Sequence, residues 1–108
     1  MNIATANPTD PYGQNVNKVY LPSGERTAAA LIDSGLGIVG AIVVTTDGTN
    51  DAECIVYDNI NGSGSVVARC PVKGSDKVGG QAIPFRTNNG IYATISGVGA
   101  KYQIYYLP

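Results

Sequence analysis

Two cysteines, Cys54 and Cys70, are the residues of this sequence with the most distinctive chemistry. They flank a loop centred near Gly62, and a symmetric hairpin about that glycine places them directly opposite each other. Opposed Cα atoms lie about 4.5–5.5 Å apart, which is within the range for a disulfide bond. The alternative is two buried thiols that act as small apolar residues, which a reducing cytosol favours. The same register pairs Val56 with Ala68 and Asp58 with Val66.

A group of oxygen-bearing side chains could suggest a calcium site. Asp47, Asn50 and Asp51 share the loop DGTND, and Asp58 follows the next apolar segment. Calcium takes six to eight oxygen ligands, and this spacing is not that of an EF-hand. We therefore interpret the loop as a hairpin turn with local hydrogen bonds, and two cysteines without histidine are too few for zinc. No metal site is expected.

Two serines, Ser34 and Ser96, are the candidate nucleophiles. The sequence contains no His, so the usual general base at neutral pH is missing, and no nucleophile elbow surrounds either serine. The glycine pairs Gly79-Gly80 and 97–99 lack the helix start and Lys-Ser/Thr pair of a phosphate loop, and we expect turns or bulges there. The sequence predicts neither an enzyme nor a cofactor.

The tyrosines near the C-terminus are the best candidates for binding. Segments 91–96 and 101–107 alternate with period two, which predicts that Tyr102 and Tyr106 are buried and that Tyr92 and Tyr105 are exposed. Exposed tyrosines and arginines are preferred anchors of protein interfaces. Tyr92, Tyr105 and Arg86 are therefore the candidate interface residues.

A glycan site is the alternative for part of this set, because aromatic rings beside polar side chains can stack on sugars. Its best cluster is Tyr92 and Arg86 with Asn88 and Asn89. The triplet 61–63, Asn-Gly-Ser, is formally a glycosylation sequon. We interpret it as a turn.

Composition limits the class of protein. The chain has 108 residues, a formal net charge of -1 and only 14% charged residues. This length fits one domain, and the charge excludes a basic nucleic-acid footprint. No apolar run is long enough for a spanning helix, and the start, MNIATANPTDPYGQN, has no secretory signal. A surface so poor in charge is typical of a protein packed in an assembly.

Short apolar segments alternate with turn signals every 8–12 residues, which predicts an all-β, small antiparallel β-sandwich. Segment 38–46 is apolar on both faces, so we expect a central strand covered on both sides. Segment 27–33 is predicted as a strand, with a helix over 25–35 as the alternative. The other expected strands are 17–21, 53–59, 66–72, 81–85, 91–96 and 101–107. The expected core comprises Ile42, Val44, Ile55, Val56, Ile95 and Ile104.

The first fifteen residues have a different composition from the rest. Ile3 and Tyr12 are their large apolar side chains, and Pro8 and Pro11 oppose regular ladder pairing. We expect residues 1–15 to form an extended N-terminal arm that contacts another subunit, and residues 16–108 to form a single β-sandwich domain.

The stretch from Gly37 onward carries a family resemblance. Its pieces are GIVGAIVVTTDGTND, a strand ending in YDN, and IPFRTNNGIYATISGVGAKYQIYYL, together about two-thirds of the chain. They resemble small structural proteins of tailed bacteriophages, of the capsid decoration or cement type. The resemblance implies a jelly-roll-like body that sits as a homotrimer on the shell. The cysteine pair and the Asn/Pro-rich start lie outside the pattern.

These observations lead to two expectations for function. The first is a non-enzymatic virion protein, made in the bacterial host cytoplasm, that binds the major capsid protein on the outside of a phage shell and stabilises it. The second is a carbohydrate- or receptor-binding β-sandwich module of a head fibre or tail. We expect neither nucleic acid nor membrane as a partner.

Overall fold

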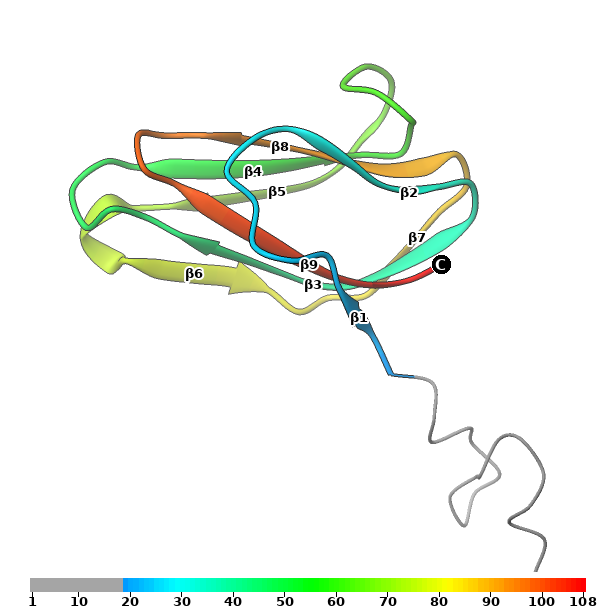
Figure 1. Cartoon of the computed structure of the whole chain (residues 1–108), viewed down its shortest axis with the longest axis horizontal. Coiled ribbons are helices and arrows are strands. Elements are labelled where there is room, and N and C mark those ends of the chain that lie inside the picture. Colours follow the sequence, from blue (N-terminus) through cyan, green and yellow to red (C-terminus); the bar gives the residue numbers. More distant parts are fainter. Residues whose placement is uncertain (1–18) are drawn as a thin grey trace, which may run out of the picture.

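Apolar segments separated by turns fold into strands along the whole of the described chain. The structure is a computed structural model, and it describes residues 19–108. The nine strands of these residues pair antiparallel within two sheets, and the antiparallel sandwich is as the sequence predicts (Figure 1). The strands are β1 (Leu21–Pro22), β2 (Ala30–Ser34), β3 (Gly37–Thr45), β4 (Ala52–Tyr57), β5 (Val66–Val72), β6 (Val78–Gln81), β7 (Phe85–Thr87), β8 (Gly90–Ser96) and β9 (Lys101–Leu107), and the 3₁₀ helix η1 spans Gly74–Asp76.

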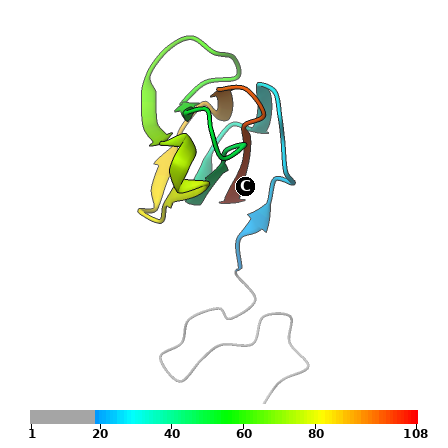
Figure 2. The ribbon, with the colours of Figure 1, turned by 90° about the vertical axis from the view of Figure 1, so that its left-hand side faces the viewer.

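The strand order is that of a jelly roll. One sheet has the order β1-β9-β3-β6, with β7 also paired to β3, and the other has the order β2-β8-β4-β5. Strands far apart in sequence pair as if one long hairpin, with its tip between β4 and β5, had been rolled up: β1 pairs with β9, and β2 with β8. This confirms the jelly-roll-like β-sandwich. Figure 2 faces the end of the sandwich that carries the β3–β4, β5–β6 and β8–β9 connections.

The core lies between the two sheets. Ile42, Val44, Val56 and Ile104 are each at most 1% exposed, as predicted, and Ile95 packs against them from a partly buried position. Tyr102 is also buried, and its hydroxyl donates to the carbonyl oxygen of Ala28 at 2.8 Å. That bond satisfies the polar end of an otherwise apolar side chain.

The prediction for Ile55 is wrong. Ile55 is half-buried and alternates with Cys54 and Val56, which are fully buried. Because successive side chains of a strand point to opposite faces, two adjacent isoleucine and valine residues cannot both enter one core. Ile55 therefore lies on the outer surface of its sheet.

The central position of β3 is confirmed, but its expected burial on both faces is wrong. β3 pairs with β9 on one side and with β6 and β7 on the other. Its inner residues are buried, whereas Ile38 on the outer side is 37% exposed. No helix or other sheet of the described residues 19–108 packs against this face. The strand is apolar on both sides without being covered on both sides.

The predicted strand 27–33 is confirmed only from Ala30, where β2 begins, and no helix forms over 25–35. The predicted strand 81–85 is wrong, since residues 82–84 separate β6 from β7. Pro84 has no backbone N–H with which to pair in a sheet. The chain therefore separates from β3 after β6 and pairs with β3 again at β7. Gly79 and Gly80, expected in a turn or bulge, lie inside β6 instead, opposite Val44 and Val43.

The loop 47–51 does not close a hairpin, contrary to prediction. It connects β3 and β4, which belong to different sheets. The turn at 97–99 is confirmed, since Gly97 and Gly99 have φ values of 114° and 70°. The expected arm, 1–15, with Ile3, Pro8, Pro11 and Tyr12, lies outside the described residues. Among residues 19–108, no helix is long and apolar enough to cross a membrane.

Candidate functional site

The outer surface of the five-stranded sheet is a largely apolar face on which no other sheet or helix of residues 19–108 packs. The register places side chains on it in rows across β1, β9, β3 and β6 or β7. We call this surface the five-strand face. Its rows are Leu107, Ile38 and Arg86; then Pro22, Tyr105 and Ala41; then Gln103, Val43 and Gly80; and finally Lys101, Thr45 and Val78.

Charge is confined to the two ends of the five-strand face. Arg86 lies in the first row, and Lys101 lies in the last, where its ammonium group is 3.4 Å from the carboxylate of Glu25. The middle rows carry uncharged side chains, and Val78 beside them is 58% exposed. Depletion of charge at the centre with polar groups at the rim is how protein interfaces are built.

Tyr20 covers part of this face in a way the sequence did not suggest. The β3–β9 register shifts between Val39 and Ala41, so Gly40 forms a bulge. A Cβ atom on Gly40 would lie 2.6 Å from the Tyr20 ring, which means that the ring rests directly on the glycine backbone. The Tyr20 ring thereby covers part of the five-strand face next to Gly40.

A hollow of about 200 Å³ opens at the Arg86 end of the five-strand face. Its walls are Leu36, Gly37, Ile38, Arg86 and Pro108. Leu36 is 68% exposed and contributes apolar surface beside the guanidinium group. The hollow combines an apolar floor with one cation, an arrangement that suits an apolar side chain next to a carboxylate.

The three predicted interface residues do not form one patch. Arg86 and Tyr105 lie on the five-strand face, but Tyr92 belongs to β8 of the other sheet and points away from the core between buried Ile91 and Ala93. Tyr92 therefore lies on the opposite side of the molecule. Its partner is Tyr57, whose ring centroid is 6.5 Å away in an edge-to-face arrangement. Tyr57 was missed, although the alternation of β4 would have placed it outward.

Asp58 organises the loops beside the Tyr57–Tyr92 pair. Its carboxylate accepts backbone N–H bonds from Asn88 (3.0 Å), Asn89 (2.7 Å) and Gly90 (3.4 Å). These bonds hold the pKa of Asp58 below its usual value, with the bond from Asn89 contributing most and those from Asn88 and Gly90 contributing less. Two elements of the proposed glycan cluster, Asn88 and Asn89, are thus fixed near the loop 58–65, whose Gly62 lies against Tyr92.

The calcium candidates are not brought together. Asp47 accepts from the backbone N–H groups of Asn50 (2.7 Å) and Thr49 (2.9 Å), and these bonds lower its pKa. Asp51 accepts from the backbone N–H of Gly74 at 2.8 Å. Asp58 follows the far end of β4, a strand of six residues, so it lies roughly 20 Å from Asp51 at about 3.3 Å per residue. Among residues 19–108 no three acidic, cysteine or histidine side chains are placed to hold a metal.

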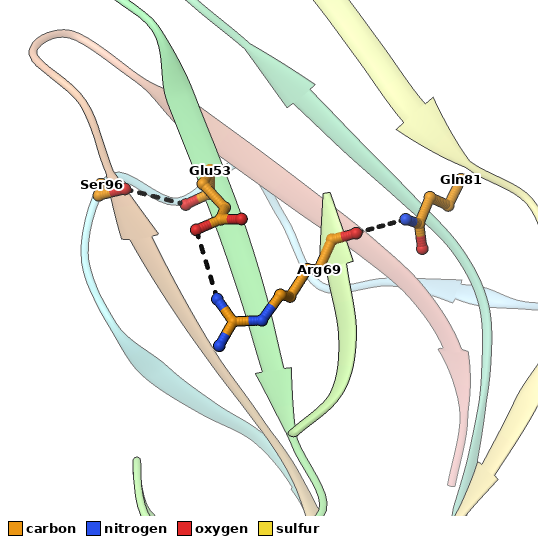
Figure 3. A network of polar contacts seen from close by, with 4 residues as sticks. All are labelled: Glu53, Arg69, Gln81 and Ser96. Atoms are coloured by element: carbon orange, nitrogen blue, oxygen red, sulfur yellow. Dashed lines mark hydrogen bonds and ion pairs between the residues drawn. The ribbon is translucent and has the colours of Figure 1, made fainter. Parts of the chain in front are cut away.

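The serine candidates lie at opposite ends of β8. Ser34 pairs with Gly90, the first residue of β8, and Ser96 is the last. The Ser96 hydroxyl donates to the carbonyl oxygen of Glu53 at 3.4 Å, as Figure 3 shows. The acceptor of that hydroxyl group is therefore a backbone carbonyl of the neighbouring strand.

Figure 3 also shows the polar contacts near β5 and β6, which are edge strands of the two sheets. The carboxylate of Glu53 lies 3.6 Å from the guanidinium group of Arg69 on β5, and the side chain of Gln81 on β6 donates to the carbonyl oxygen of Arg69. The Gln81 bond therefore links the edge strands of the two sheets. Next to it is a groove of about 560 Å³, lined by Asp51, Ala52, Pro71, Val72, Lys73, Asp76, Val78, Gly79 and Gly80.

The register of the cysteine hairpin is predicted correctly around Cys54 and Cys70, which face each other, and for Val56 with Ala68. The pairing of Asp58 with Val66 is wrong, because a bulge after Val56 brings Tyr57 opposite Val66 instead. Both cysteines are buried free thiols.

Comparison with protein-family models, with curated proteins and with solved structures finds no match to this chain.

Proposed function

We propose that this chain is a non-enzymatic virion structural protein that binds the outside of a phage capsid through the five-strand face and stabilises the shell as a homotrimer. The observation that supports the proposal is the five-strand face itself, a surface of an antiparallel sheet whose middle rows are uncharged and whose charges lie at its two ends. The resemblance of segment 37–107 to phage structural proteins supplies the partner, the major capsid protein.

The mechanism follows from mass action. A protein that binds the assembled shell better than its free subunits shifts the equilibrium toward the shell. Each contact on the five-strand face is small, but a trimer engages three neighbouring sites at once. Linked binding of this kind multiplies weak affinities without new contacts, which suits an 11.2 kDa chain.

The test uses empty shells of the phage whose genome encodes the chain. The chain is mixed with shells, sedimented and quantified in the pellet. Tyr105→Lys places a charge at the centre of the five-strand face and is expected to abolish sedimentation. Tyr92→Lys changes the same residue type on the opposite face and is the matched control. Binding that survives Tyr105→Lys but not Tyr92→Lys contradicts the proposed surface.

Oligomeric state is measured separately by size-exclusion chromatography with light scattering. A trimer is expected, and a stable dimer or tetramer contradicts that part of the proposal. Tyr105→Lys tests whether the same face also joins the subunits, since a monomeric variant would place self-association there.

A carbohydrate- or receptor-binding module of a head fibre or tail is the second candidate. The edge-to-face Tyr57–Tyr92 pair favours it, because the pair lies beside Asp58 and the Asn88–Asn89 backbone that Asp58 holds. Aromatic rings next to fixed polar loops can stack on sugars. A glycan array with the wild-type chain and Tyr92→Ala decides it: glycan binding that is lost in Tyr92→Ala supports this candidate, and a silent array contradicts it.

A further inference from the structure

The chain contains two Asn-Gly dipeptides whose surroundings differ sharply. Asn61-Gly62 lies in the exposed loop between β4 and β5, and Asn89-Gly90 lies at the start of β8. The two loops are neighbours, since Asp58 binds the second and precedes the first. The dipeptide is the same at both sites, but the residue after the glycine is Ser63 at the first and Ile91 at the second. Differences in their chemistry therefore come from these neighbours and from the fold around them.

An Asn-Gly sequence can modify itself. The backbone nitrogen of the glycine attacks Cγ of the asparagine side chain, a C–N bond forms, and the side-chain amide leaves as ammonia with the proton from that nitrogen. Water then opens the cyclic imide to aspartate or isoaspartate. During the attack the glycine nitrogen loses its proton and negative charge develops on Oδ1. Donors aimed at Oδ1 therefore lower the barrier.

Asn61 has such donors in place. The backbone N–H of Ser63 donates to Asn61 Oδ1 at 3.0 Å, and the Ser63 hydroxyl donates to the same oxygen at 2.5 Å. The loop holds Ser63 in position, because Asn59 donates from its side-chain amide to the Ser63 carbonyl oxygen at 2.9 Å. Asn61 and Gly62 are both exposed, so water reaches the imide.

Asn89 has the opposite environment. The N–H of Gly90, the group that must lose its proton, points at the Asp58 carboxylate with a distance of 3.4 Å between Gly90 N and Asp58 Oδ1. A nearby negative charge opposes that loss. Gly90 is buried, and a Cβ atom there would lie 2.6 Å from the carbonyl oxygen of Asn59. The backbone has little room to rotate into the attack geometry.

We propose that Asn61 is a self-modification site that deamidates in the folded protein, whereas Asn89 is protected by Asp58. Conversion of Asn61 adds one negative charge and takes the formal net charge from -1 to -2. Because Gly62 packs against the ring of Tyr92, the new charge appears beside the Tyr57–Tyr92 pair. This inference does not depend on the proposed function.

The test follows both asparagines by peptide mapping and mass spectrometry during incubation at mildly alkaline pH. In the folded chain, Asn61 is expected to convert at least about tenfold faster than Asn89, a smaller effect than that of a buried oxyanion donor. In urea the two rates are expected to converge, because both sites are Asn-Gly. Equal rates in the folded chain, or a ratio that urea leaves unchanged, would overturn the proposal.

Two substitutions test the two parts of the proposal, acceleration at Asn61 by the Ser63 donor and protection of Asn89 by the Asp58 carboxylate. Ser63→Ala removes the hydroxyl donor in an exposed loop and is expected to slow Asn61 several-fold while Asn89 stays unchanged. Asp58→Asn removes the carboxylate and is expected to accelerate Asn89 without accelerating Asn61. An Asn61 rate that Ser63→Ala does not lower contradicts the assigned role of Ser63.

Discussion

Cys54 and Cys70 lie directly opposite each other on β4 and β5, and both point into the core as free thiols. They are 0% and 2% exposed. The pKa of Cys54 is raised to about 12, mainly by burial and to a smaller extent by the neighbouring Cys70. The thiolate that starts disulfide chemistry is therefore scarce at neutral pH, although the register suits a bond.

Oxidation is the first prediction. Oxidised glutathione is expected to form the Cys54–Cys70 disulfide slowly in the native chain and quickly in mild urea, which opens the β5 edge. Once formed, a bridge over a loop of this size stabilises by about 3 kcal/mol, which raises the melting temperature by roughly 4–8 °C per kcal/mol. Mass spectrometry follows the loss of two hydrogens, and Cys70→Ser is the control. An oxidised chain that melts no higher than the reduced one contradicts the expected geometry.

The second prediction compares a side chain on the inner face of the five-stranded sheet with one on the outer face of the four-stranded sheet. Ile104→Ala removes a side chain that is 0% exposed, and it is expected to cost about 2–5 kcal/mol through lost burial and a cavity. Ile55→Ala makes the same truncation on an outer face and should cost clearly less. Urea unfolding of both variants gives the comparison, and equal losses would show that the assigned faces of the strands are wrong.

Much of the fold was predictable because alternation is a strong signal in half-buried strands. The last two strands have the predicted inner and outer faces, and Cys54 and Cys70 have the predicted register. The predicted degree of burial is wrong for three tyrosines, since Tyr106 is only partly buried and Tyr92 and Tyr105 are half-buried and not exposed. The predictions that were wrong depended on pairing between strands far apart in the sequence. The loop after β3 has ordinary turn chemistry, and nothing local to it says that β4 belongs to the other sheet.

The candidate site was predicted only in part. Arg86 and Tyr105 share a face because β7 and β9 both pair with β3, a relationship that no local pattern contains. Tyr20 was missed because its place on Gly40 depends on a bulge. Bulges also caused the error at Asp58, since one extra residue reverses which side chains point outward.

The third prediction concerns Gly80 in β6. A Cβ atom there would lie 2.4 Å from the carbonyl oxygen of Ile42, which is backbone and cannot move aside. Gly80→Ala is therefore expected to destabilise by about 1–3 kcal/mol, as overpacking does. Gly62→Ala is the control, because its Cβ would meet only the Tyr92 ring at 3.4 Å. Thermal melts that show the same loss for both variants contradict this explanation.

The fourth prediction is a pH dependence. The pKa of folded Asp58 is lowered by the N–H groups of Asn89, Asn88 and Gly90, so its ionised form stabilises the fold above the unfolded pKa of about 3.9. That stability is lost as the pH falls through the lower, folded pKa. Asp58→Asn is expected to melt below wild type at pH 7, with a gap that narrows below about pH 4. A gap that stays constant across this range would mean that the charge of Asp58 does not matter.

The last prediction concerns residues 2–14, which lie outside the described part of the chain. The core of residues 19–108 takes its buried apolar side chains from Val39 to Ile104, so deleting residues 2–14 is expected to leave the melting temperature of the isolated chain nearly unchanged. Ordering a residue costs about 1–2 kcal/mol, and the segment has few large apolar side chains, Ile3 and Tyr12, to offset that cost. Residues 1–14 would reach about 45–50 Å if extended, which is far enough to contact a neighbour. The deletion is therefore expected to weaken trimerisation or shell binding. Light scattering and shell sedimentation measure this, with Ile3→Ala/Tyr12→Ala as the matched variant. Unfolding on deletion would make the segment part of the fold, and unchanged trimer and shell binding would remove its assembly role.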